Sequence, residues 1–120
     1  MKRLSAREEE IMGYFWEKGP LFVKQIVEFY EPQHLHFNTV STFVRGLEAQ
    51  GFLDHHVHGV TYQYYPIVSR EEYGKNTLKT AVSKFFNNSY LNVVSSLVEE
   101  EDISLDELKE LIRQVEQGNE

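Results

Sequence analysis

The chain has 120 residues, no cysteine, and 19 acidic against 12 basic residues, which gives a formal charge of −7. This length suits one domain or a small domain with an appendage, and 41% hydrophobic residues are enough for a core. The lack of cysteine excludes disulfides, thiolate metal sites and cysteine nucleophiles. No apolar run reaches the roughly 18 residues of a membrane span, and no apolar segment follows the basic N-terminus, so we expect a cytoplasmic protein.

The first helix is predicted from a capping box, in which the hydroxyl of Ser5 and the carboxylate of Glu8 bond to each other's backbone N–H groups. Gly19-Pro20 ends this helix, because glycine adopts the left-handed cap and proline cannot continue the ladder. A second helix is predicted over Phe22–Tyr30 and ends at Glu31-Pro32. The apolar stripe of the first helix consists of Leu4, Ile11, Met12, Phe15 and Trp16.

The third helix is predicted from Asn38, taken as its N-cap, to Gln50, with Gly51 as the terminator. One face is apolar, and we expect it to be buried. The other face carries small hydroxyl side chains and one arginine, where a solvated face would be rich in Glu and Lys. Small polar side chains permit close approach to another surface, and arginine can reach a guanine edge or a phosphate. The apolar face is Val40, Phe43, Val44 and Leu47, and the polar face is Thr39, Ser41, Thr42 and Arg45.

Two strands with a glycine turn follow the third helix. The runs Phe52–Val57 and Val60–Tyr65 are rich in β-branched and aromatic residues and are joined near His58-Gly59, which predicts a hairpin. Pro66 ends the second strand. Three helices followed by a hairpin is the order of a winged helix, whose third helix enters the major groove of DNA. The predicted fold class is therefore mainly α with a small β-hairpin wing, and residues 1–68 form the DNA-binding domain.

Residues 69–120 are predicted to form a helical dimerisation arm. A capping box at Ser69–Glu72 opens a helix to about Phe86, and Asn87-Asn88 interrupts it. The side chains expected to face inward are Tyr73, Leu78, Val82, Phe85 and Phe86. Two more apolar stripes follow, and a capping box at Ser104–Glu107 begins the last one. The final 40 residues are too few to bury two apolar helices in one chain, whereas two chains would bury them together. The expected interface residues are Phe85, Phe86, Tyr90, Val94, Leu97, Leu108, Leu111 and Ile112.

The distribution of charge along the chain supports the division into a DNA-binding domain and a dimerisation arm. Residues 1–80 carry 9 basic and 10 acidic side chains, whereas residues 81–120 carry 3 and 9. DNA-binding domains usually have a basic surface, and the nearly neutral first part removes most of the objection that the total charge raises. We expect few cationic side chains to contact DNA, and we therefore expect DNA affinity to depend on dimerisation. The predicted DNA-binding residues are Asn38, Thr39, Ser41, Thr42, Arg45, His56 and His58.

Four stretches of the sequence resemble the penicillinase-repressor family, which contains β-lactamase, methicillin-resistance and copper-responsive repressors. They are EEEIMGYFWEKGPLFVKQIVE, FNTVSTFVRGLEAQGFL, YYPIVSREEY and EEDISLDELKELI. The resemblance extends from about Leu4 to about Val115. It implies a homodimeric winged-helix repressor that binds a palindromic operator, that controls a β-lactamase-type or related operon, and that is regulated through a membrane sensor-protease system.

The chain departs from the family pattern at several positions. Gly46 stands where a basic residue is common, and the wing carries His55, His56 and His58 in place of Lys or Arg. The family's cleaved bond is Asn-Phe, whereas the aligned pair is Ser96-Leu97. The copper-responsive members use a cysteine cluster that this chain lacks.

Two alternatives remain open at this stage. The first is a winged-helix protein-interaction module that has lost sequence-specific DNA binding, which the acidic balance and Gly46 favour. The second concerns the histidines, since His34 and His36, like His56 and His58, share a side of an extended chain and suit a metal. No third or fourth ligand is evident, so we predict no metal centre and no cofactor. Nucleotide-binding and hydrolase motifs are absent, and we therefore predict that the chain is not an enzyme.

Overall fold

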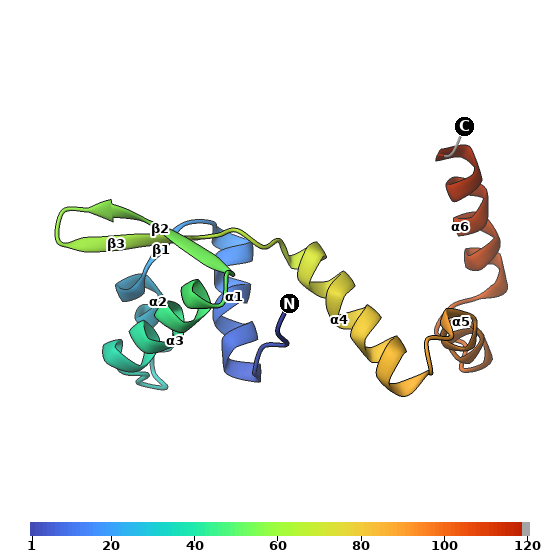
Figure 1. Ribbon diagram of the computed structural model, residues 1–120, viewed down its shortest axis with the longest axis horizontal. Coiled ribbons are helices and arrows are strands. Elements are labelled where there is room, and N and C mark those ends of the chain that lie inside the picture. The colour runs from blue at the N-terminus through green and yellow to red at the C-terminus, as the bar shows by residue number, and fades with distance from the viewer. Residues whose placement is uncertain (119–120) are drawn as a thin grey trace. The chain divides into compact units, whose positions relative to one another are not determined.

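A computed structural model describes residues 1–118 (Figure 1). The chain forms two compact units, Met1–Thr77 and Leu78–Glu120. The first unit contains α1 (Ala6–Lys18), β1 (Leu21–Phe22), α2 (Val23–Phe29), α3 (Phe37–Ala49), β2 (Leu53–His58) and β3 (Thr61–Pro66). Helix α4 (Arg70–Phe85) runs from the first unit into the second, which also contains α5 (Tyr90–Glu99) and α6 (Leu105–Gly118).

The first unit has the predicted winged-helix order of three helices and a hairpin. Strands β2 and β3 pair in antiparallel register from Leu53↔Pro66 to His58↔Thr61, and the hairpin extends beyond the three helices in Figure 1. The two-residue turn begins at Gly59, whose φ of 61° is a conformation that favours glycine. The predicted fold class is therefore confirmed.

A short strand replaces the start of the predicted second helix. Phe22 was expected to be helical, but Leu21 and Phe22 form β1, which pairs antiparallel with β3 at Tyr64 and Gln63. The sheet order is thus β1-β3-β2. Helix α2 begins only at Val23, and the side chain of Gln25 accepts a hydrogen bond of 2.9 Å from the N–H of Phe22. This strand ties the segment before α2 to the base of the wing.

The core of the first unit lies between α1, α2, α3 and the sheet. Its members come from every element of the unit, which fixes the orientation of α3 with respect to the hairpin. The residues of this unit with at most 1% of their surface exposed are Ile11, Met12, Phe15, Ile26, Val40, Val44, Leu47, Phe52 and Leu53.

Local sequence signals set the ends of α1. The N–H of Ser5 donates to Glu8 at 2.8 Å and the N–H of Glu8 donates to the Ser5 hydroxyl at 3.2 Å, so the predicted capping box is confirmed. The hydrogen bond from the Ser5 backbone lowers the pKa of Glu8. At the other end Gly19 has a φ of 83°, and its N–H donates to the carbonyl of Phe15 at 2.8 Å.

The first turn of α4 packs into the first unit through Tyr73. Its hydroxyl accepts a hydrogen bond from the N–H of Leu4 at 3.0 Å and donates one to Glu9 at 2.6 Å. Burial and the bond to Glu9 raise the pKa of Tyr73. Trp16 lies 5.7 Å from the Tyr73 ring and donates from Nε1 to the carbonyl of Val68 at 2.8 Å. These bonds anchor the start of α4 against α1.

Replacing Tyr73 by Phe is expected to lower the free energy of unfolding by about 1–3 kcal/mol, because the N–H of Leu4 loses its partner in a buried position. Trp16 is the single tryptophan and lies beside Tyr73, so its fluorescence in a urea titration monitors this unit. Tyr62→Phe removes an equivalent hydroxyl from an exposed side chain and is expected to leave the midpoint unchanged. Equal midpoints for both variants would contradict the anchoring role of Tyr73.

Apart from Val82, the described apolar side chains of the second unit are half-buried or exposed within one chain. Asn87 and Asn88 end α4 with φ values of 51° and 64°, as the predicted interruption requires. Among the described residues, no side chain of α5 or α6 is buried. Val82 of α4 is buried as predicted, but three other side chains predicted to face inward are exposed in the single chain: Leu78 (54%), Phe85 (69%) and Phe86 (37%).

The predicted boundary between residues 68 and 69 lies just before α4, whereas the two compact units divide within α4, between Thr77 and Leu78, so its first two turns belong to the first unit. Within residues 1–118, no helix is both long enough and apolar enough to cross a bilayer.

Candidate nucleic-acid interface

Helix α3 begins at Phe37, two residues before the start that an N-cap at Asn38 predicts. The chain is extended at His36, with φ of −65° and ψ of 145°, and the carbonyl of His36 accepts the first helical bond from Val40 at 3.0 Å. His36 is therefore the N-cap, and the prediction that Asn38 caps the helix is wrong. Asn38 lies in the first turn with its side chain exposed, which leaves its amide free for an outside partner.

The buried face of α3 determines which side chains face outward. Val40, Val44 and Leu47 are all 0% exposed and hold the helix against the core. Of the five side chains predicted to read DNA from α3, four are exposed and Ser41 is half-buried. The four exposed ones are Asn38, Thr39, Thr42 and Arg45. The structure thus places the predicted set on the outer side of one helix.

Two of these side chains also bond to the helix backbone. The hydroxyl of Thr42 donates to the carbonyl of Asn38 at 2.8 Å, and Nε of Arg45 donates to the carbonyl of Ser41 at 3.4 Å. Arg45 is the single basic residue of α3, and its terminal nitrogens are available to a ligand. The first turn of α3 has no acidic residue, so the positive end of the helix dipole is not neutralised there.

The hairpin presents aromatic and imidazole side chains. His56 and His58 are exposed on β2, and the ring of His56 stacks on Tyr65 with centroids 4.6 Å apart. His58 makes an edge contact with Phe22 at 5.4 Å. Residues 53–66 contain no lysine or arginine, so any charge attraction from the hairpin depends on protonated histidine.

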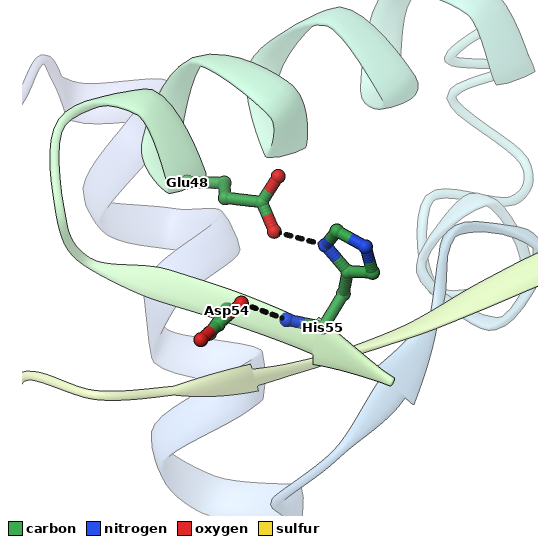
Figure 2. A group of neighbouring side chains, drawn as sticks. All are labelled: Glu48, Asp54 and His55. Carbon is green, nitrogen blue, oxygen red and sulfur yellow. Dashed lines mark hydrogen bonds and ion pairs between the residues drawn. The ribbon is translucent and has the colours of Figure 1, made fainter. Parts of the chain in front are cut away.

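A hydrogen-bonded contact between His55 and Glu48 connects the end of α3 to the hairpin. Figure 2 shows Nδ1 of His55, on β2, directed at a carboxylate oxygen of Glu48, on the last turn of α3. The His55 ring also stacks on Tyr62 with centroids 4.2 Å apart. Burial raises the pKa of the neighbouring Tyr64, and the charge of Glu48 adds to this shift whereas Arg45 opposes it. This connection couples the position of α3 to that of the wing.

The sequence did not predict this contact between Glu48 and His55. Together with Asp54, these two residues form a group of three side chains of the types that can bind a metal ion. Ligand atoms of Glu48, Asp54 and His55 lie within 4.8 Å of one another. The group differs from the histidine pairs singled out in the sequence. Each member already has a partner in the chain, since His55 pairs with Glu48 and Asp54 accepts the N–H of His55 at 2.8 Å. We assign the group a structural role, and the absence of a metal centre stays a prediction.

A helix with an exposed polar face, held by a three-helix core beside a hairpin wing, defines the winged helix-turn-helix class of DNA-binding proteins. The sequence model of the Penicillinase repressor family matches residues 4–117, and the chain belongs to this family. The predicted resemblance is therefore confirmed.

Two kinds of named relative match the chain over most of its length. The chain is 29% identical over 109 residues to the methicillin resistance regulatory protein MecI of Mammaliicoccus sciuri, covering 90% of this chain and 89% of the relative. MecI of Staphylococcus aureus gives the same values. The penicillinase repressor of Bacillus licheniformis is 22% identical over 116 residues, which cover 96% and 91% of the two chains. A solved structure from Clostridium acetobutylicum, assigned to the MarR family of transcriptional regulators, has a TM-score of 0.45 and 19% identity, covering 97% of this chain and 77% of that one.

The family defines the general function of the chain. It is a winged-helix transcriptional repressor and not an enzyme, as the sequence predicted. The comparisons do not assign individual residues to DNA or to the dimer, and those assignments stay predictions.

Proposed function

We propose that the chain represses transcription as a homodimer in the cytoplasm, with α3 of each protomer in the major groove of one half of a palindromic operator. The observation that carries this proposal is the outer face of α3, where small polar side chains surround Arg45 on a helix held by three fully buried residues. Small side chains let the helix approach the base edges closely, and Arg45 supplies a bidentate donor for guanine or phosphate.

The remaining predicted contacts come from the first turn of α3 and from the hairpin. Asn38 and Thr39 lie at the start of α3, where helix N–H groups and the helix dipole favour phosphate. His56 and His58 are exposed on β2 and would face the DNA backbone or the minor groove.

The dimer is proposed to form through α5, α6 and the end of α4. Within the described residues α5 and α6 bury no side chain, although α6 has apolar residues at a repeat of three and four along one side. Phe85 is 69% exposed, and burial of such a surface against a second copy is favourable by about 25 cal/mol per Å². The proposed interface consists of Phe85, Phe86, Tyr90, Val94, Leu97, Leu108, Leu111 and Ile112.

The named relatives regulate methicillin resistance or repress a penicillinase. By that similarity we propose that the regulated genes include a β-lactamase-type or related operon, under a membrane sensor-protease system. The bond aligned with the family's cleavage position, Ser96-Leu97, lies inside α5 with both side chains half-buried. Cleavage at this bond would therefore require α5 to unwind locally.

The test is binding of the full-length chain to the DNA upstream of its own gene, measured by gel shift and footprinting at several salt concentrations. We expect a palindromic footprint and a plot of log K against log salt with a slope of about −2 to −4, since each phosphate contact contributes about −0.9 and the reading face has few cations. An unrelated duplex of equal length serves as the control. Failure to bind at low salt would contradict the proposal and support the protein-interaction alternative, which the acidic balance and Gly46 favour.

A further inference from the structure

A groove lined by both polar and hydrophobic residues lies beside the exposed polar face of α3 (the proposed reading face), between the first turns of α3 and the hairpin. Four of its hydrophobic side chains are largely exposed, which is unusual for a surface that faces only water. They are Phe37, Val57, Val60 and Tyr62. Ser41, one of the predicted DNA contacts, lines the same groove, so the groove is continuous with the reading face.

Phe37 is placed to contact whatever α3 reads. It is the first residue of α3, and Ser41 and Arg45 follow it at intervals of four residues, which places the three side chains along one side of the helix. Phe37 is 52% exposed, whereas Val40, one turn further along the helix, is fully buried. The N-terminal residues of a recognition helix are the ones that contact base edges.

The chemistry of the major groove restricts what an exposed phenyl ring can contact there. Adenine, guanine and cytosine present hydrogen-bond donors and acceptors, and thymine alone adds a methyl group, at C5. A phenyl ring offers no hydrogen bond and makes favourable apolar contact with such a methyl. Capping of α3 does not explain an exposed phenylalanine at position 37, because His36 is the N-cap and makes no side-chain capping bond.

We propose that Phe37 is a specificity-determining residue that contacts the C5-methyl group of a thymine in each operator half-site, beside the bases contacted from Ser41 and Arg45. The groove formed with Val57 and Tyr62 shields this contact from water. The inference rests on the proposed function, because it requires α3 to lie in the major groove. The Phe37 contact adds a preference for thymine at the N-terminal end of α3, which carries no cationic side chain.

The first experiment replaces thymine by uracil, which removes the C5-methyl group and nothing else. A duplex is selected from a random library by the full-length chain, and each symmetry-related pair of thymines is then replaced by deoxyuridine in turn. Affinity is measured by fluorescence anisotropy. We expect one pair to weaken binding by about fourfold per half-site, which corresponds to the burial of one methyl-sized group. A scan in which no position affects affinity would overturn the proposal.

The second experiment combines the uracil duplex with Phe37→Ala. This variant is expected to bind the thymine duplex more weakly and to bind the thymine and uracil duplexes equally, because the two changes remove the same contact. Ile67→Ala is the matched control, since Ile67 is also 52% exposed but lies outside the groove. It should retain the wild-type ratio of affinities. Phe37→Leu keeps an apolar side chain and should retain part of the ratio.

The outcomes separate this inference from the function on which it rests. If the wild-type chain selects no duplex, the proposed DNA binding fails, and the thymine contact fails with it. If the wild-type chain binds its duplex and Phe37→Ala keeps the wild-type thymine-to-uracil ratio, DNA binding stands and Phe37 does not read thymine. A flat uracil scan together with a change in sedimentation of Phe37→Ala would assign the groove to protein contact and would also overturn the proposal.

Discussion

The double variant Leu108→Asp/Leu111→Asp is expected to sediment as a monomer at concentrations where the wild-type chain is a dimer. Both side chains lie on the apolar side of α6, and Leu111 is 55% exposed in the single chain. Burying two carboxylates at an interface costs more than the interface gains. Because one protomer then reads only one half-site, operator affinity should fall by about 10²- to 10⁴-fold.

The control for this variant is Arg113→Asp, which makes the charge more negative by the same two units on the opposite side of α6. It should remain a dimer and should retain most of its operator affinity. Sedimentation velocity gives the oligomeric state, and anisotropy with the operator duplex gives the affinity. A dimer that persists in Leu108→Asp/Leu111→Asp would show that the interface lies elsewhere in the chain.

Replacing Arg45 by alanine is expected to cost about 1–3 kcal/mol of binding free energy per half-site if the guanidinium bonds a guanine edge in bidentate form. Arg45 is exposed and is the one cation of α3, so no neighbouring side chain of that helix replaces it. The slope of log K against log salt should also become shallower, by about one per protomer where the guanidinium neutralises a phosphate. Anisotropy titrations at four salt concentrations measure both quantities.

Arg45→Lys distinguishes the two kinds of contact. Lysine keeps the charge but not the planar fork of donors. A guanine contact predicts loss of discrimination between the operator and a duplex changed at one base pair, with the salt slope retained. A phosphate contact predicts that Arg45→Lys binds both duplexes much as the wild-type chain does. Unchanged operator affinity in Arg45→Ala would remove Arg45 from the interface.

Features that depend on neighbouring residues could be predicted from the sequence. The capping box of Ser5 and Glu8, the hairpin turn at Gly59 and the interruption at Asn87 are each encoded within four residues, and the structure shows all three. The buried face of α3 followed from the spacing of Val40, Val44 and Leu47. The exposed face of α3 could then be inferred as the side opposite the buried one, although its DNA contacts stay a prediction.

Features that depend on contacts between different elements, or on the backbone conformation of a loop, could not be predicted. Strand β1 is two residues long, and it exists because Leu21 and Phe22 pair with β3 some 40 residues later. The hydrogen-bonded contact of Glu48 with His55 joins a helix to a strand across the turn at Gly51, and no periodic pattern indicates it. Asn38 is a good capping residue by type, but the extended backbone at His36 places the cap elsewhere.

The hydrogen bond from Thr42 to the carbonyl of Asn38 uses the only proton that the Thr42 hydroxyl can donate. In the proposed complex Thr42 therefore meets DNA as an acceptor with a methyl group beside it. An amino group of adenine or cytosine complements such an acceptor, whereas O6 and N7 of guanine and O4 of thymine repel it. In the proposed complex the backbone of α3 thus sets the hydrogen-bond preference of Thr42, which favours the amino group of adenine or cytosine.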